Sequence, residues 1–76
     1  MNKDRRNKIQ ELVAKVESLS SEIQDLIDEE QEAFDNMPES LQASERGEKS
    51  EVAISNLESA MQCIEDTVNS LEDASE

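Results

Sequence analysis

The sequence predicts an all-α protein, in which two long helices form an antiparallel, coiled-coil-like hairpin that self-associates into a helical bundle. Two apolar runs recur at intervals of three and four residues, and the only Pro and the only Gly, Pro38 and Gly47, lie between them. Such spacing places apolar side chains on one face of an α-helix. The charges are also divided unequally along the chain. A chain of 76 residues has room for one domain, residues 1–76.

The first run predicts a helix over residues 3–35. With Ile9 at heptad position a, three positions in seven are apolar, which is the width of a core-facing stripe in a bundle. Asn2 or Asp4 is the expected N-cap, because short polar side chains satisfy the first free N–H groups of a helix. The stripe consists of a (Ile9, Val16, Ile23, then Glu30), d (Leu12, Leu19, Leu26, Ala33) and e (Val13, Ser20, Ile27, Phe34).

The second run predicts a helix over residues 50–74 with a seven-residue repeat. Glu occupies every e position, and small residues occupy g, so one flank of the stripe is anionic and the other permits a close approach. Position a is held by Ile54, Met61 and Val68, d by Leu57, Ile64 and Leu71, e by Glu51, Glu58, Glu65 and Glu72, and g by Ala53, Ala60, Thr67 and Ala74.

The linker, residues 36–49, contains the helix breakers. Pro38 disfavours the helical conformation at Met37 and suits the first position of a new turn, so a short helical turn is expected after it. Ser44 and Ser50 are alternative N-caps of the second helix, and Gly47 weakens the first turn if that helix begins at Ser44.

The charge distribution favours the antiparallel arrangement. Residues 1–15 carry five basic and two acidic side chains, whereas residues 16–76 carry two basic and eighteen acidic ones. An antiparallel hairpin sets the basic start of the first helix beside the acidic end of the second, and sets Arg46 and Lys49 beside the acidic end of the first. Surface ion pairs of this kind, each contributing about 0–1 kcal/mol, select orientation more than they stabilise.

A single hairpin of this size is close to the lower limit for an independently stable core. The disulfides and metal sites that usually stabilise such small domains are missing. One Cys cannot form an internal disulfide, and a chain without His or a Cys pair has no structural zinc site. Association of two or more copies is therefore predicted. The expected oligomer core is Ile9, Leu12, Val16, Leu19, Ile23, Leu26, Ile54, Leu57, Met61, Ile64, Val68 and Leu71.

The composition argues against several function classes. A chain without His, Tyr or Trp, and with one Cys that has no neighbouring base, offers few groups for catalysis, so a non-enzymatic protein without cofactor or metal is expected. A net charge of −13 disfavours direct nucleic-acid binding. No apolar segment is long enough to span a membrane and no signal peptide is evident, which predicts a protein of the cytoplasm.

The linker is the most informative alternative contact site for a ligand or partner. Its polar residues could hold an anion at the start of the second helix. The competing interpretation, which the usual behaviour of loops favours, is that its apolar residues cap the bundle and that Arg46 pairs with Glu30 or Glu32. The candidate contacts are Asn36, Gln42, Ser44, Arg46 and Lys49.

Three stretches, Met1–Arg6, Phe34–Glu48 and the Leu-Glu-x-Ala blocks at Leu57 and Leu71, give the chain a resemblance to known small proteins. It resembles a group of helical-hairpin proteins carried by phages, prophages and conjugative elements of Gram-positive bacteria. The resemblance spans nearly the whole chain and is most specific in the linker. It implies a mobile-element accessory protein that acts by binding, and it transfers no functional residues.

Three functions follow as hypotheses. The first is an acidic helical oligomer that binds and inhibits a host protein, such as a defence protein, through its acidic faces and linker end. The second is an oligomeric sponge that sequesters a nucleotide immune signal at Ser44, Arg46 and Lys49. The third is a nucleic-acid mimic, whose carboxylates imitate a phosphate backbone.

Overall fold

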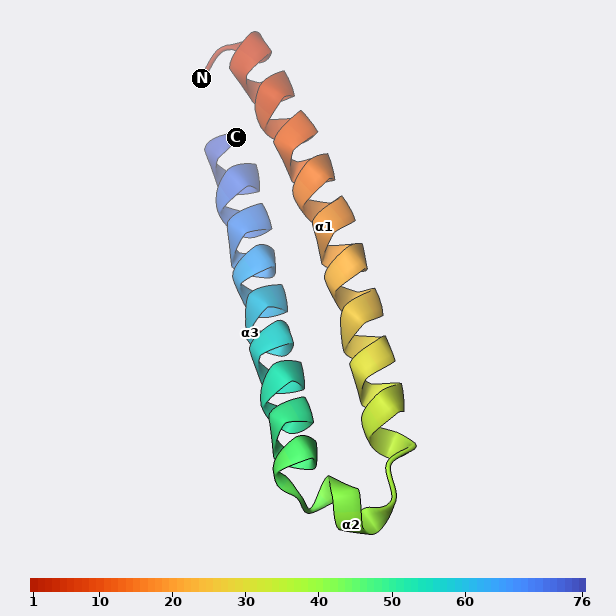
Figure 1. Cartoon of the computed structure of the whole chain (residues 1–76). Coiled ribbons are helices and arrows are strands. Elements are labelled where there is room, and N and C mark those ends of the chain that lie inside the picture. Colours follow the sequence, from red (N-terminus) through yellow and green to blue (C-terminus); the bar gives the residue numbers. More distant parts are fainter.

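The computed structural model describes the whole chain, Met1–Glu76, as two long helices lying side by side and joined by a short one (Figure 1). Helix α1 spans Lys3–Asp35, α2 spans Glu39–Gln42 and α3 spans Glu45–Ala74. The two termini lie at the same end of the molecule, so α1 and α3 are antiparallel (Figure 1). The predicted all-α hairpin is confirmed.

Helix α1 begins and ends where its sequence provides caps. The side-chain oxygen of Asn2 accepts a hydrogen bond of 2.8 Å from the backbone N–H of Arg5, which satisfies one of the free donors of the first turn. At the other end, the backbone N–H of Asn36 donates to the carbonyl of Glu32 at 3.0 Å. Pro38 then prevents a further turn, since the residue before a proline is pushed out of the helical region.

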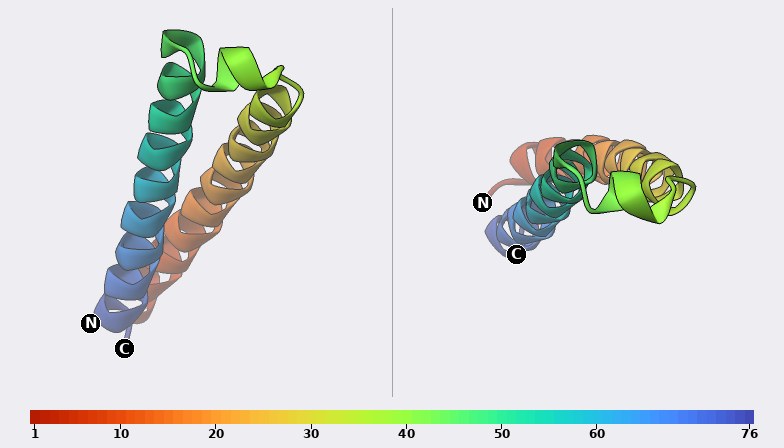
Figure 2. Two further views of the ribbon diagram at one scale, coloured as in Figure 1. Left: turned by 90° about the horizontal axis from the view of Figure 1, so that it is seen from below. Right: turned by 60° about the horizontal axis from the view of Figure 1, so that its bottom comes forward.

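The linker is compact, and α2 lies across the end of the hairpin between α1 and α3 (Figure 2). Pro38 is the N-cap of α2, and its carbonyl accepts hydrogen bonds from the N–H groups of Leu41 and Gln42 at 2.9 and 3.0 Å. The side-chain amide of Gln42 donates to the carbonyl of Phe34 at 3.0 Å. This bond ties α2 to the last turn of α1, where carbonyl groups lack helical partners.

The start of α3 differs from the expected residue 50. Ser44 is the N-cap, and α3 begins at Glu45, so Ser50 is a buried residue of the second turn. The carbonyl of Ser44 accepts from the N–H of Glu48 at 3.0 Å, and its hydroxyl donates to the carbonyl of Leu41. Gly47 does not interrupt the helix. It is buried, and its missing side chain leaves the space that the backbone of Gln42 occupies.

Three side-chain hydrogen bonds between α1 and α3 mark the register of the pair. They occur near the termini, in the middle and near the linker, so the two helices stay in contact along most of their length. They join Gln10 Nε2 to Ser75 Oγ at 3.0 Å, Ser20 Oγ to Met61 Sδ at 3.5 Å and Ser50 Oγ to Glu30 Oε1 at 2.6 Å.

The expected ion pairs between the helices do not form. The only ion pair within 4.0 Å joins Lys49 to Glu45, one turn away in the same helix, at 3.4 Å. Arg46 pairs with neither Glu30 nor Glu32, and the Glu30 carboxylate accepts a hydrogen bond from Ser50 instead. At the other end of the hairpin, the positions of the helix ends explain why the basic start of α1 forms no ion pairs with α3. Because α3 ends at Ala74 opposite Gln10, the first turns of α1 extend beyond the acidic end of α3.

The hairpin is long and thin, with extents of 58 × 15 × 11 Å. Val13 and Ile54 are its only buried apolar side chains, because two helices can cover one another on one side only. Neither α1 nor α3 contains a stretch of the length and apolarity that crossing a membrane requires.

Candidate functional site

The candidate contacts of the linker divide into two groups. Asn36 and Gln42 have structural roles at the end of α1: Asn36 is the C-cap, and Gln42 donates to the carbonyl of Phe34. Neither lines the hollow formed by the other candidates. The sequence did not reveal this division, because the same amide groups suit a ligand and an uncapped helix end.

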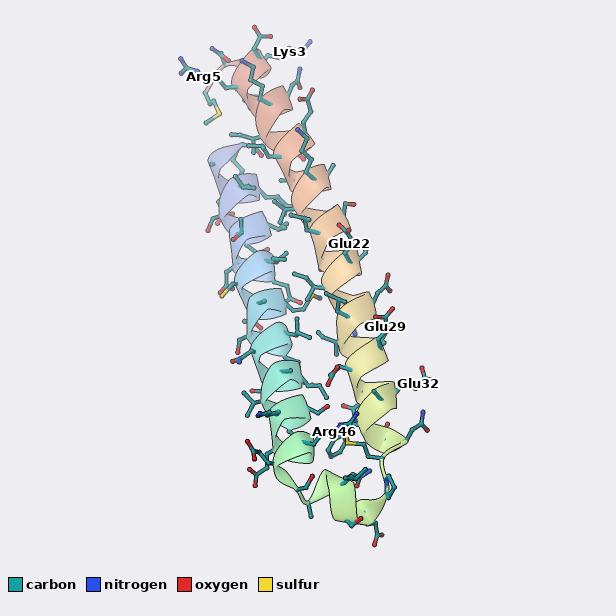
Figure 3. All side chains as sticks on the ribbon, viewed as in Figure 1. Lys3, Arg5, Glu22, Glu29, Glu32 and Arg46 are labelled. Atoms are coloured by element: carbon teal, nitrogen blue, oxygen red, sulfur yellow. The ribbon has the colours of Figure 1, made fainter.

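Ser44, Arg46 and Lys49 are brought together with Glu45 around one shallow hollow at the start of α3. Figure 3 shows Arg46 at this end of the hairpin. The Lys49 ammonium already contacts the Glu45 carboxylate, and no apolar side chain lines the hollow. It offers a cation to an anion but no flat apolar surface on which a nucleotide base could stack.

The two long helices use different parts of their heptads to contact each other. In α1 the half-buried or buried residues are those at a and e, from Ile9 to Phe34, including Val13. In α3 they are those at a and d, from Gly47 to Leu71, together with Ala53 and Ala60 at g. The d leucines of α1 therefore lie outside the seam between the helices, although the sequence places them in the same apolar stripe.

The predicted oligomer core is thus divided by the structure. Nine of its twelve residues lie along the seam within one hairpin, and three are exposed. The exposed residues form a row at seven-residue intervals, which we call the leucine face: Leu12, Leu19 and Leu26, whose exposed fractions are 46%, 53% and 51%.

The opposite side of the hairpin carries a row of carboxylates. Three shallow hollows follow one another along this side, between the e glutamates of α3 and the b positions of α1. None of the seven Lys and Arg residues lines these hollows. We define the acidic face as the four e glutamates of α3 together with the b residues of α1 that line the hollows, of which only Glu17 is charged: Glu51, Glu58, Glu65, Glu72, Glu17, Gln24 and Gln31.

The contribution of α1 to the acidic face was missed in the sequence. The glutamates of α3 stand out because all four e positions are identical, but the b positions of α1 are mixed. Their seven-residue spacing shows that they share one side of α1, but that this side lies next to the glutamates of α3 depends on the rotation of α1. Glu17 and Glu65 line one hollow together, from opposite helices, so the acidic face belongs to the hairpin and not to α3 alone.

The N-terminal end of α1 carries a separate group of cations. Lys3, Arg5, Arg6 and Lys8 are all exposed and lie beyond the last turn of α3. Figure 3 shows Lys3 and Arg5 at this end. The guanidinium of Arg6 donates to the carbonyl of Met1 at 2.7 Å. We call these four residues the basic tip.

Other groups of chemical interest are dispersed. Cys63 of α3 is an exposed free thiol. No group of three or more carboxylate or thiol side chains is arranged to hold a metal ion.

These features define the molecule as a two-helix hairpin with an acidic face, a leucine face and a basic tip. Comparison of the chain with protein-family models, with curated proteins and with solved structures gives no match.

Proposed function

We propose that this chain is a non-enzymatic interaction protein of phage or mobile-element origin, which binds a basic surface of a host protein in the cytoplasm through its acidic face. Inhibition of that protein, such as a component of host defence, is the proposed outcome. The observation that carries the proposal is the row of four glutamates on one side of α3. Glu51, Glu58, Glu65 and Glu72 are all exposed and are separated by one heptad each.

The geometry of the row suits protein recognition. Seven residues of α-helix rise about 10.5 Å, so the row presents a carboxylate at that interval along a straight surface. A partner with Lys or Arg side chains at a similar interval could pair with each. The hollows between the glutamates have polar rims and an apolar floor that includes Ile54 and Val68, so they can also accept the stems of long basic side chains.

The long shape supports the same proposal. The hollows of the hairpin are open to solvent, and an exposed helical surface of 58 Å in length gives a protein partner room to bind along it. Exposed carboxylates also increase the rate of encounter with a basic partner, an effect that salt weakens.

The test compares two variants from which the same number of charges has been removed. In the first, Glu51, Glu58, Glu65 and Glu72 are all replaced by Gln. In the matched control, four carboxylates on the outer backs of the helices are replaced by the corresponding amides: Glu11, Asp25, Asp66 and Asp73.

Immobilised wild-type protein and both variants are incubated with a lysate of a Gram-positive host, and the retained proteins are identified. We expect one host protein to be retained by the wild type and the control but lost from the acidic-face variant and at high salt. Equal retention by all three proteins would contradict the proposal. Displacement of the retained protein by duplex DNA would instead favour the nucleic-acid mimic.

A further inference from the structure

We propose that a second copy of this chain covers the leucine face, with the two α1 helices antiparallel and a two-fold axis beside Leu19. This proposal does not depend on the proposed function, because it concerns the opposite side of the hairpin. Leu12, Leu19 and Leu26 are each about half exposed, and they lie in line along α1. Single exposed leucines are ordinary, but three at heptad spacing on one helix make a continuous strip.

The neighbouring surface of α3 is free of carboxylates. In an antiparallel pair with this seam, the d positions of α1 and the g positions of α3 lie on the same side. From Ala53 to Ala74, the g and c positions of α3 contain no charged residue, in a chain with twenty Asp and Glu residues. A partner could therefore approach without burying a charge. The residues are Ala53, Asn56, Ala60, Cys63, Thr67, Ser70 and Ala74.

The charges beside the leucines identify the partner as a second copy in antiparallel orientation. The g positions of α1, next to the leucine row, are Lys8, Lys15, Glu22 and Glu29, and all four are exposed. Figure 3 shows Glu22 and Glu29 projecting away from α3. A two-fold axis beside Leu19 sets Lys15 against the partner's Glu22 and Lys8 against the partner's Glu29, whereas a parallel arrangement would set like charges together.

The two ends of α1 support the same register. Leu19 is the midpoint of Lys3–Asp35, so the two α1 helices overlap over their full length. The basic tip, which α3 does not reach, then lies beside the partner's acidic end, where Glu32 and Asp35 are exposed. Cations at the start of a helix and anions at its end both oppose the helix dipole. In the proposed dimer, each group is compensated by the opposite charges of the other copy.

The proposed register also determines where the only thiol, that of Cys63, lies in the dimer. Ser20 contacts Met61 across the seam, so the point on α3 level with Leu19 is close to Cys63. The same two-fold axis therefore brings Cys63 near its counterpart in the second copy. The dimer is a four-helix bundle in which α1 faces α1 and α3 faces α3, an arrangement that covers the leucine face and leaves the acidic face open.

Sedimentation equilibrium tests the contact at the leucine face. We expect the wild type to be a dimer at micromolar concentration and Leu19→Glu to raise the dissociation constant about a hundredfold, because two charges enter the centre of the interface. Val52→Glu is the matched control, since Val52 is 59% exposed on the outer back of α3 and should leave the dimer intact. A monomeric wild type, or a dimer that Leu19→Glu does not weaken, would overturn the proposal.

A charge exchange tests the orientation without altering the leucines. Lys15→Glu should weaken the dimer about tenfold, and adding Glu22→Lys should restore it, because the two residues meet only across the two-fold axis. Circular dichroism on each variant checks that the helices are retained. A double variant that stays as weak as Lys15→Glu would exclude the antiparallel register.

Discussion

Gly47 lies where the backbone of α2 leaves no room for a side chain. A Cβ atom built on it would lie 2.0 Å from the carbonyl oxygen of Gln42 and 2.5 Å from the carbonyl carbon. Both atoms belong to the backbone, so a larger residue can be accommodated only if α2 moves. In an open helix, alanine would be favoured over glycine by about 1 kcal/mol, but this contact reverses the preference.

We therefore predict that Gly47→Ala lowers the free energy of unfolding by about 2 kcal/mol, as overpacking commonly does. Denaturant titration at one protein concentration measures the change. Ser59→Ala, on the exposed back of α3, is the control and should be neutral or slightly stabilising. A Gly47→Ala variant as stable as the wild type would show that the close approach of α2 and α3 is not maintained in solution.

Glu30 and Ser50 show where single residues could and could not be predicted. The sequence shows that Glu30 interrupts the apolar a row of α1, and the structure confirms that it faces the seam, where it is half buried. It accepts a hydrogen bond from Ser50, which is only 4% exposed. That partner could not be predicted, because it depends on where α3 begins, and two serines were equally suitable caps.

At the scale of the elements, the order of the helices and the bounds of α1 were predictable, but the start of α3 and the rotation of α1 were not. Apolar residues at a, d and e define a stripe about three positions wide, and a single partner helix covers two of them. In α1 these are a and e, which leaves Leu12, Leu19 and Leu26 outside. The glutamate row of α3 was visible in the sequence, whereas its counterpart on α1 required this rotation.

The exposed start of α1 leads to a prediction about its N-cap. Asn2→Ala removes the acceptor of the Arg5 N–H, which costs about 1 kcal/mol in the first turn. Because this turn lies beyond the end of α3, the loss should remain local. We expect amide hydrogen exchange of the first turn to become about fivefold faster, since the turn opens independently of the rest.

The midpoint of global unfolding measures whether the effect is local. It should change little in Asn2→Ala. A fall in the midpoint as large as that expected for Gly47→Ala would mean that the basic tip is part of the cooperative core.

At the scale of the whole molecule, the shape is far from that of a compact domain. The radius of gyration of the hairpin is 17.3 Å, whereas a compact chain of the same length would have one of about 11 Å. Two hairpins that overlap completely, as proposed, would double the mass and thicken the rod without lengthening it.

Small-angle X-ray scattering measures this difference. We expect a particle with twice the mass of the chain and a length close to the 58 Å of one hairpin. A dimer about twice as long would indicate contact at the ends of the hairpins and would contradict the overlap of the two α1 helices.

The position of the two termini at one end has a mechanical consequence (Figure 1). A load applied between Met1 and Glu76 pulls the helices apart sideways and breaks the seam one layer at a time. The bond between Gln10 and Ser75 is strained first, and the contact of α2 with Gly47 is strained last. The contacts between the helices therefore break one after another under a small force. A force along the helix axes would instead load all of these contacts at once.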